Sequence, residues 1–105
     1  MAKHINITTS PTTTTLVTKN GATGNTFGGN INKITIANFS DHADGATVNL
    51  FLQNASAADF YFIKNVVIPK GVTLVLNDNL SFDSSVYSLK LLNTGTSPAL
   101  TVIIK

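Results

Sequence analysis

The sequence predicts an all-β fold, an antiparallel two-sheet β-sandwich of the Greek-key or jelly-roll-like kind, with about eight short strands. The 105-residue chain contains no Glu, no Arg and one Met, whereas Thr and branched aliphatic residues are abundant. Such residues lose side-chain freedom in a helix but fit a pleated sheet. From residue 34 onward, short stretches of alternating polar and apolar residues are separated by turn signals, which is the pattern of a sandwich or small barrel.

The first residues are expected to form an arm. Residues 3–8 alternate Ile5 and Ile7 with polar side chains, so they form a short strand or an arm that becomes one on docking. The following tract TTSPTTTT, at 8–15, is rich in threonine and offers little apolar surface to bury. It is therefore interpreted as a linker or flexible arm.

A glycine-rich loop is expected to follow this arm. Residues 15–19 can form a second short strand, and residues 20–30 contain four of the seven glycines, with Phe27 as the anchor of a loop. The predicted organisation is thus an extended Thr/Gly-rich arm and loop at 1–30, followed by a β-sandwich body at 31–105.

The body begins with two strands, at 33–39 and 47–54, joined by a polar turn at 40–46. Alternation directs one set of their side chains to the core, namely Ile34, Ile36, Val48, Leu50 and Leu52. A third strand, at 59–68, is apolar on both faces, so both faces are expected to be at least partly covered.

A sharp turn at 69–71 ends this third strand. With Pro69 at its second position and Gly71 closing it, a type I-like hairpin turn is the simplest prediction. Strands at 72–76, 86–93 and 99–105 complete the sandwich. Their inward side chains are Val72, Leu74, Leu76, Tyr87, Leu89, Leu91, Leu100, Val102 and Ile104.

The charge pattern argues against a nucleic-acid ligand. The seven Lys and five Asp give a net charge of +2, and the lysines are spread evenly along the chain, whereas binding to phosphates requires clustered cations. There is no cysteine, and no apolar stretch reaches the ~20 residues that span a bilayer. Without a signal-peptide pattern, synthesis in the cytoplasm is expected, with no membrane partner.

Two acidic clusters are candidates for a metal site and for a catalytic site. His42 with Asp41 and Asp44 could hold a hard cation through oxygen ligands, and Asp78 with Asp83 could form a carboxylate pair for glycoside hydrolysis. In both places the ordinary role of Asp as a cap of local backbone N–H groups is the favoured interpretation. No metal, no cofactor and no catalytic residue is therefore predicted.

The edges of the sandwich are the preferred candidates for binding. Phe51 and Tyr61 face outward by alternation and could cover an interface or stack on a sugar ring. The apolar residues of the arm could serve as pegs on a neighbour's sheet edge. The predicted interaction residues are Ile5, Ile7, Leu16, Val17, Phe51, Tyr61 and Ile103.

Three stretches of the body also resemble small structural proteins of tailed bacteriophage particles, especially those of marine and cyanobacterial hosts. They are ITIAN at 34–38, the hairpin-like YFIKNVVIPKGVTLVL at 61–76 and the closing strand YSLKL at 87–91. In such proteins, strands of these kinds recur in this order. The resemblance runs over residues 33–54 and 59–105, about two-thirds of the chain, and does not reach residues 1–30.

The resemblance implies a virion structural protein that binds other particle subunits. A non-enzymatic role is expected because no catalytic motif is present, and a homo-oligomer is expected because a sandwich of this size has little stability to spare. A capsid decoration (cement) protein is preferred on small size and low charge, and a neck, tail or baseplate subunit is the alternative. A different alternative is a carbohydrate-binding or adhesive module at a fibre tip. The absence of tryptophan, a preferred platform for sugars, counts against it. The expected location is the virion.

Overall fold

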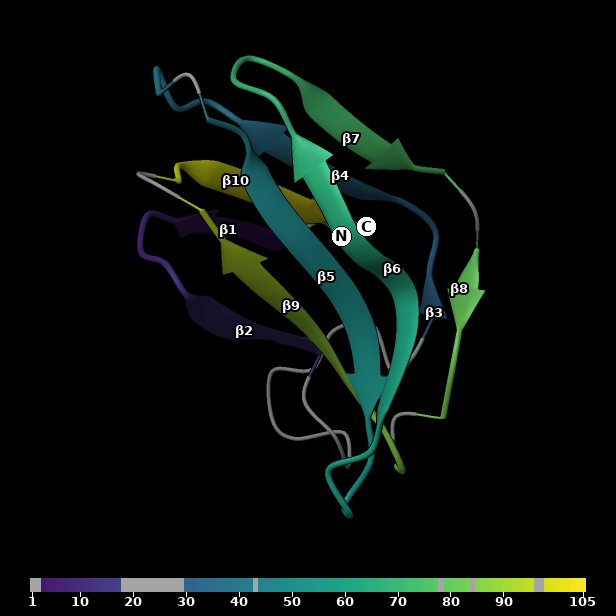
Figure 1. Ribbon diagram of the computed structural model, residues 1–105. Coiled ribbons are helices and arrows are strands. Elements are labelled where there is room, and N and C mark those ends of the chain that lie inside the picture. Colours follow the sequence, from purple (N-terminus) through teal and green to yellow (C-terminus); the bar gives the residue numbers. More distant parts are fainter. Residues whose placement is uncertain (1–2, 18–29, 43, 78, 84, 96–97) are drawn as a thin grey trace.

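A computed structural model describes residues 3–17, 30–42, 44–77, 79–83, 85–95 and 98–105 (Figure 1). These residues form strands and loops without a helix, so the predicted all-β class is confirmed. The strands are β1 (Lys3–Ile7), β2 (Thr12–Val17), β3 (Asn30–Ile31), β4 (Ile34–Asn38), β5 (Ala46–Gln53), β6 (Asp59–Ile68), β7 (Thr73–Leu76), β8 (Leu80–Ser81), β9 (Ser88–Thr94) and β10 (Leu100–Ile104).

The strands build two four-stranded antiparallel sheets and one small ribbon. Sheet A has the order β1-β10-β4-β7, sheet B has the order β2-β9-β5-β6, and β3 pairs with β8. Apart from the β3–β8 ribbon, this is the strand order of an eight-stranded jelly roll. One side of the sandwich is therefore formed by the edge strands β1 and β2, and the other side by β6 and β7.

Residues 3–17 belong to the sandwich. Of the two expectations for residues 3–8 the short strand is confirmed, whereas the linker or flexible arm expected at 8–15 is wrong for Thr12–Thr15. β1 pairs with β10 along its whole length, and β2 pairs with β9. The threonine tract forms much of β2, because a β-branched residue suits the half-exposed surface of an edge strand. Residues 18–29, and with them the predicted Phe27 loop, lie outside the described residues.

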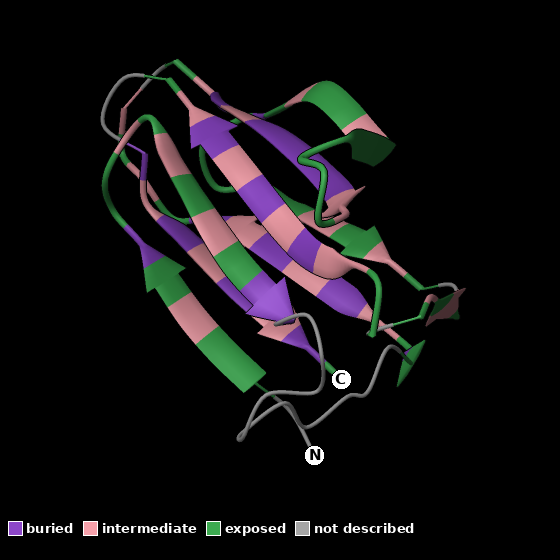
Figure 2. Cartoon of the chain, turned by 90° about the horizontal axis from the view of Figure 1, so that it is seen from below, coloured by how far each residue is buried: buried purple, intermediate pink, exposed green. Residues whose placement is uncertain are grey.

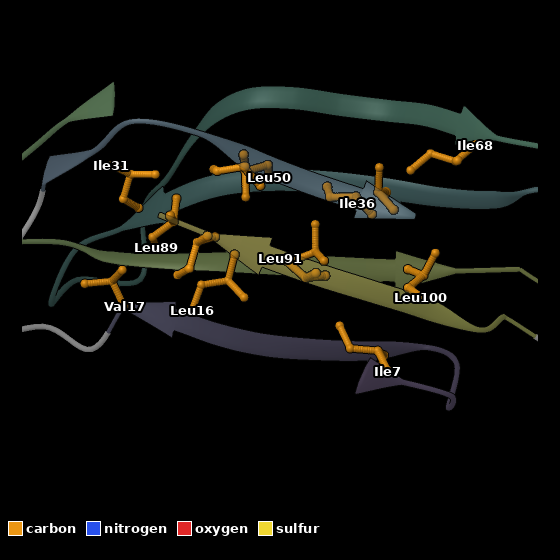
Figure 3. Close-up of a cluster of buried hydrophobic side chains, with 14 of the residues drawn as sticks. Ile7, Leu16, Val17, Ile31, Ile36, Leu50, Ile68, Leu89, Leu91 and Leu100 are labelled. Carbon is orange, nitrogen blue, oxygen red and sulfur yellow. The ribbon is translucent and has the colours of Figure 1, made fainter. Parts of the chain in front are cut away.

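The core lies between the two sheets (Figure 3). Buried and less buried residues alternate along β4, β9 and β10, which gives these strands the banded pattern of Figure 2. The buried apolar side chains of the cluster are Ile7, Leu16, Val17, Ile31, Ile34, Ile36, Ala46, Val48, Leu50, Ile68, Leu89, Leu91, Leu100, Val102 and Ile104. Each large one contributes about 1.5–3 kcal/mol by leaving water.

The turn after β6 carries the chain from one sheet to the other, so the predicted hairpin is wrong. β6 lies in sheet B and β7 in sheet A. The Val72 N–H donates to the Pro69 carbonyl at 3.1 Å, and Gly71 has a φ of 72°. Positive φ at the third position defines a type II-like turn. Pro69 therefore occupies the first position of the turn and not the second.

Candidate interaction surface

Large exposed apolar side chains gather on the β6/β7 side of the sandwich. Eight of them among the described residues are between 41% and 56% exposed: Phe39, Phe60, Tyr61, Phe62, Val67, Val72, Val75 and Val86. Six belong to β6, to β7 or to the turn that joins them. We call this side of the molecule the apolar side.

The other two residues lie beside the same strands. Phe39 follows Asn38, whose backbone N–H donates to the Val72 carbonyl at 3.0 Å. Val86 precedes Tyr87, whose ring meets that of Phe60. The exposed large apolar side chains thus lie on the edge strands β6 and β7 or next to them.

The opposite side of the sandwich is polar. The exposed residues of β1 and β2 are Lys3, His4, Asn6, Thr13 and Thr15. A soluble monomer exposes scattered apolar residues, but a gathered set marks a binding surface. The contrast between the two sides makes β6 and β7 the candidate interaction surface.

Five of the eight residues lie at the two ends of β6, a strand labelled in Figure 1. Phe60, Tyr61 and Phe62, near the start of β6, are called the aromatic patch. Tyr61 lies opposite Phe51 on the outer face of sheet B, whereas Phe60 lies opposite Leu52 on the other face. Phe39 and Val72, at the β6–β7 turn, form the turn patch.

The rings of the aromatic patch are held by neighbours in the same chain. The Tyr61 ring packs on Phe51 with a centroid separation of 5.4 Å and a tilt of 47°. The Phe60 ring meets Tyr87 edge-on at 5.8 Å and 86°. The Lys64 ammonium lies 4.9 Å from the centroid of the Tyr61 ring, a favourable position for a cation.

Phe51 is not available for binding, contrary to the prediction. It lies opposite Tyr61 in the register and outside the core cluster, yet it is only 5% exposed. Alternation along β5 correctly predicts that Phe51 points away from the core. It does not predict that Phe51 is covered by a residue of the neighbouring strand in the same sheet. Tyr61 is the residue of this pair that meets solvent.

Two irregularities bend β6 at the aromatic patch. The register with β5 shifts between Val48 and Leu50 and again between Leu50 and Phe51. Asn65 has a φ of 56°, and its backbone N–H donates to the Asn49 Oδ1 at 2.8 Å. Bulges of this kind interrupt the ladder and discourage another strand from adding at an edge.

A polar chain of side chains runs beside the patch. The Lys90 Nζ donates to the Gln53 Oε1 at 2.7 Å, and the Gln53 Nε2 donates to the Asp59 Oδ1 at 2.9 Å. Asp59 and Lys64 are both exposed, and they bracket the aromatic patch along β6.

Most of the predicted interaction residues belong to the core instead. Ile7, Leu16 and Val17 are buried in the cluster between the sheets (Figure 3), and Ile5 packs against it partly buried. Ile103 is half-buried and pairs with His4 and Thr35 in sheet A. Together with the burial of Phe51, this leaves Tyr61 as the single well-exposed residue of the predicted set.

The sequence reasoning missed Phe60, Phe62 and the turn patch. A usable signal was present at 60–62, because three consecutive aromatic residues in a strand cannot all face one core. For Phe39 and Val72 no such signal exists, since their exposure depends on where β4 ends and β7 begins, and the prediction that Val72 faces inward is wrong.

Local hydrogen bonds link Ser40, His42 and Asp44. The His42 N–H donates to the Ser40 Oγ at 3.0 Å, and the Asp44 N–H donates to the His42 Nδ1 at 3.2 Å. The described part of the chain contains no group of three or more His, Asp or Glu side chains that could hold a metal ion.

Asp83 organises the loop before β9. Its Oδ1 accepts hydrogen bonds from both the hydroxyl and the backbone N–H of Ser85, and its carbonyl accepts from Val86 and Tyr87 at 3.0 and 2.9 Å. The Ser85 hydroxyl, followed by the Ser85 N–H, lowers the pKa of the Asp83 carboxyl. Asp78, the proposed partner of Asp83 in a carboxylate pair, lies outside the described residues.

No helix among the described residues is long and apolar enough to cross a membrane. Comparison with models of protein families, with curated proteins and with solved structures found no match to the chain.

Proposed function

We propose that this chain is a non-enzymatic structural subunit of a tailed bacteriophage particle, and that it works by binding other subunits of that particle. Capsid decoration is the preferred position. The support is the resemblance of residues 34–38, 61–76 and 87–91 to particle proteins, together with a jelly-roll strand order, which is common in viral capsid domains.

The observation that carries the proposal is the apolar side of the sandwich. A domain of 105 residues here exposes eight large apolar side chains, each by more than two-fifths, which is a large number for its size. The jelly-roll fold occurs in proteins of many functions. An exposed apolar surface, however, is expected on a protein that stays bound to another protein.

The same proposal covers a neck, tail or baseplate position. Such positions differ from decoration in copy number and in the subunit that is bound, and both kinds of contact would use the apolar side. Decoration remains preferred because the chain is small and carries little charge.

The carbohydrate-binding alternative receives less support from the geometry. Lys64 already lies over the ring of Tyr61, and Phe51 packs against that ring. A sugar that stacked on the Lys64 side would have to displace the ammonium group. Phe51, the other aromatic residue considered for stacking, is buried.

The proposal is tested by add-back to particles that were assembled without this chain. Purified protein should bind them saturably, at a fixed copy number per particle. Phe39→Lys combined with Val72→Lys should weaken the binding at least about tenfold, because both charges would have to leave water in the contact. Thr13→Lys combined with Thr15→Lys, on the polar side, is the matched control and should bind normally. Absence of saturable binding by the unmodified protein would exclude the function.

A further inference from the structure

The four edge strands of the sandwich differ in how well they resist the addition of another strand. The ladder of β6 is interrupted by two register shifts, and that of β2 by one between Thr15 and Val17. β1 carries the charged side chain of Lys3 at its start. Irregular registers and charged side chains both hinder an edge strand from pairing with another chain. β7, with the sequence TLVL, has a regular register and no charge.

The backbone of β7 has polar groups that point away from its neighbour β4. The Asn38 N–H donates to the Val72 carbonyl at 3.0 Å, and the pairing of β4 with β7 continues in this register. Because hydrogen-bonded and non-hydrogen-bonded pairs alternate in an antiparallel ladder, the two leucines of β7 direct their backbone groups to β4. Thr73 and Val75 direct theirs away from it. Among the described residues, no strand pairs with β7 on that side.

The side chains of β7 indicate what kind of strand fits this edge. Val75 is 47% exposed, whereas Leu74 and Leu76 pack against the core cluster and are only partly buried. The stretch 72–77 contains no charged residue. Cross-strand neighbours are favourable when apolar side chains meet on the same face of the sheet. The occupant of this edge is therefore an uncharged strand with apolar side chains on both of its faces.

A second copy of β7 is a strand of this kind. A two-fold axis at Val75, perpendicular to the sheet, places Val75 opposite Val75 of the other copy, so that each N–H donates to the carbonyl of the other. In the same register, Leu74 lies opposite Leu76 of the other copy on the core side. Such a contact uses the same surface twice and closes with two copies. The irregular or charged edges β1, β2 and β6 of a second copy fit β7 less well.

We propose that β7 is a self-association edge, to which β7 of a second copy adds antiparallel, so that two four-stranded A sheets join into one sheet of eight strands. Because β7 has only four residues, the contact is weak in dilute solution and is favoured where many copies are held close together, as on a particle. The inference names one contact that the proposed function requires and in this sense rests on it. It is tested on the isolated protein, so that either can fail while the other holds.

The first test is the molar mass of the purified protein by light scattering, over a concentration range from micromolar to millimolar. The mass should rise from 11.1 kDa toward twice that value. Val75→Lys should keep the mass of one chain, because like charges then lie directly opposite each other. Val67→Lys is the matched control: it changes a similarly exposed valine on the edge strand β6 and should dimerise like the unmodified chain.

A second variant tests whether the contact is made by the backbone. Val75→Pro removes one N–H group, and at this position the group points away from β4, so the ladder between β4 and β7 keeps its hydrogen bonds. This variant should also have the mass of one chain at every concentration. A circular dichroism spectrum of each variant shows whether the fold is kept.

Amide hydrogen exchange tests the same contact in the unmodified protein. The amides of Thr73 and Val75 should exchange at least about tenfold more slowly at millimolar than at micromolar concentration, because pairing in the dimer protects them. The amides of Leu74 and Leu76, which are bonded to β4 in every copy, should show no such dependence on concentration.

Three results would overturn the inference. The first is a mass of one chain for the unmodified protein at every concentration. The second is a dimer that Val75→Lys or Val75→Pro leaves unchanged. The third is a doubled mass without slower exchange of the Thr73 and Val75 amides, which would place the contact elsewhere on the molecule.

Discussion

Buried asparagine side chains hold the irregular segments of this sandwich. The Asn38 Nδ2 donates to the Ile68 carbonyl at 2.8 Å and so links the end of β4 in sheet A to the end of β6 in sheet B. Asn49 accepts the N–H of Asn65 in the bulged part of β6. The Asn93 Nδ2 donates to the Thr9 carbonyl at 2.9 Å, next to the turn between β1 and β2.

Asn49→Ala is expected to destabilise the protein by about 1–3 kcal/mol, because it leaves the Asn65 N–H without its acceptor. The midpoint of urea unfolding measures this loss. Asn32→Ala, at an exposed position, is the control and should leave the midpoint nearly unchanged. An equal effect of the two substitutions would show that the Asn49 hydrogen bond does not support β6.

Asp83 should make the loop before β9 sensitive to acid. Its pKa is lowered in the folded protein, chiefly by the Ser85 hydroxyl, so the unfolded chain binds more protons in this range. The stabilisation is therefore present above the unfolded pKa of about 3.9 and is lost as the pH falls through the lower folded value.

The carboxyl resonance of Asp83 in an NMR titration should move at a pH below the ordinary Asp pKa of about 3.9, and Ser85→Ala should raise the pKa of Asp83. If Ser85→Ala leaves the titration of Asp83 unchanged, the assigned cause is wrong.

At the scale of elements, removal of β1 tests whether the first residues are an arm or a component of the fold. Removal of residues 1–9 deletes all of β1, exposes the edge of β10 and removes Ile7 from the core. The loss should exceed about 3 kcal/mol, since Ile7 alone contributes about 1.5–3 kcal/mol.

At about 4–8 °C per kcal/mol, the melting temperature should fall by at least ~12 °C, or the cooperative transition should disappear. The control is His4→Ala, which trims an exposed side chain of β1 and keeps the strand. If the truncated chain melts like the full-length chain, the first residues are an arm after all.

Strand positions were predictable where polar and apolar residues alternate regularly. The predictions of strands succeeded where this alternation is present and failed where it is absent. β4, β9 and β10 have every second side chain buried, as expected from their sequences. β2 was misread because threonine suits a linker and an edge strand equally well. The turn after β6 was predictable from Pro69 and Gly71, but its crossing to the other sheet depends on contacts distant in sequence.

The candidate surface was less predictable for the same reason. The burial of Phe51 depends on the register of β6 over β5, and that register is set by two bulges. A single sequence shows which residues alternate, but not where a neighbouring strand slips by one position. Tyr61 was found because its exposure follows from alternation alone.

At the scale of the whole molecule, the fold separates a polar side from an apolar side. Both lie along the edges of a sandwich with extents of 39 × 29 × 22 Å. The polar side carries the threonines of β2 and the exposed polar residues of β1, whereas the apolar side carries the aromatic patch and the turn patch.

The central claim is that this chain is a permanent component of a phage particle. Quantitative mass spectrometry of density-purified particles, from a host that produces the chain, tests it most directly. The chain should band with the major capsid subunit at a constant ratio across the particle peak and remain after a high-salt wash. Its absence from those particles, with the chain recovered only in the soluble fraction, would contradict the claim.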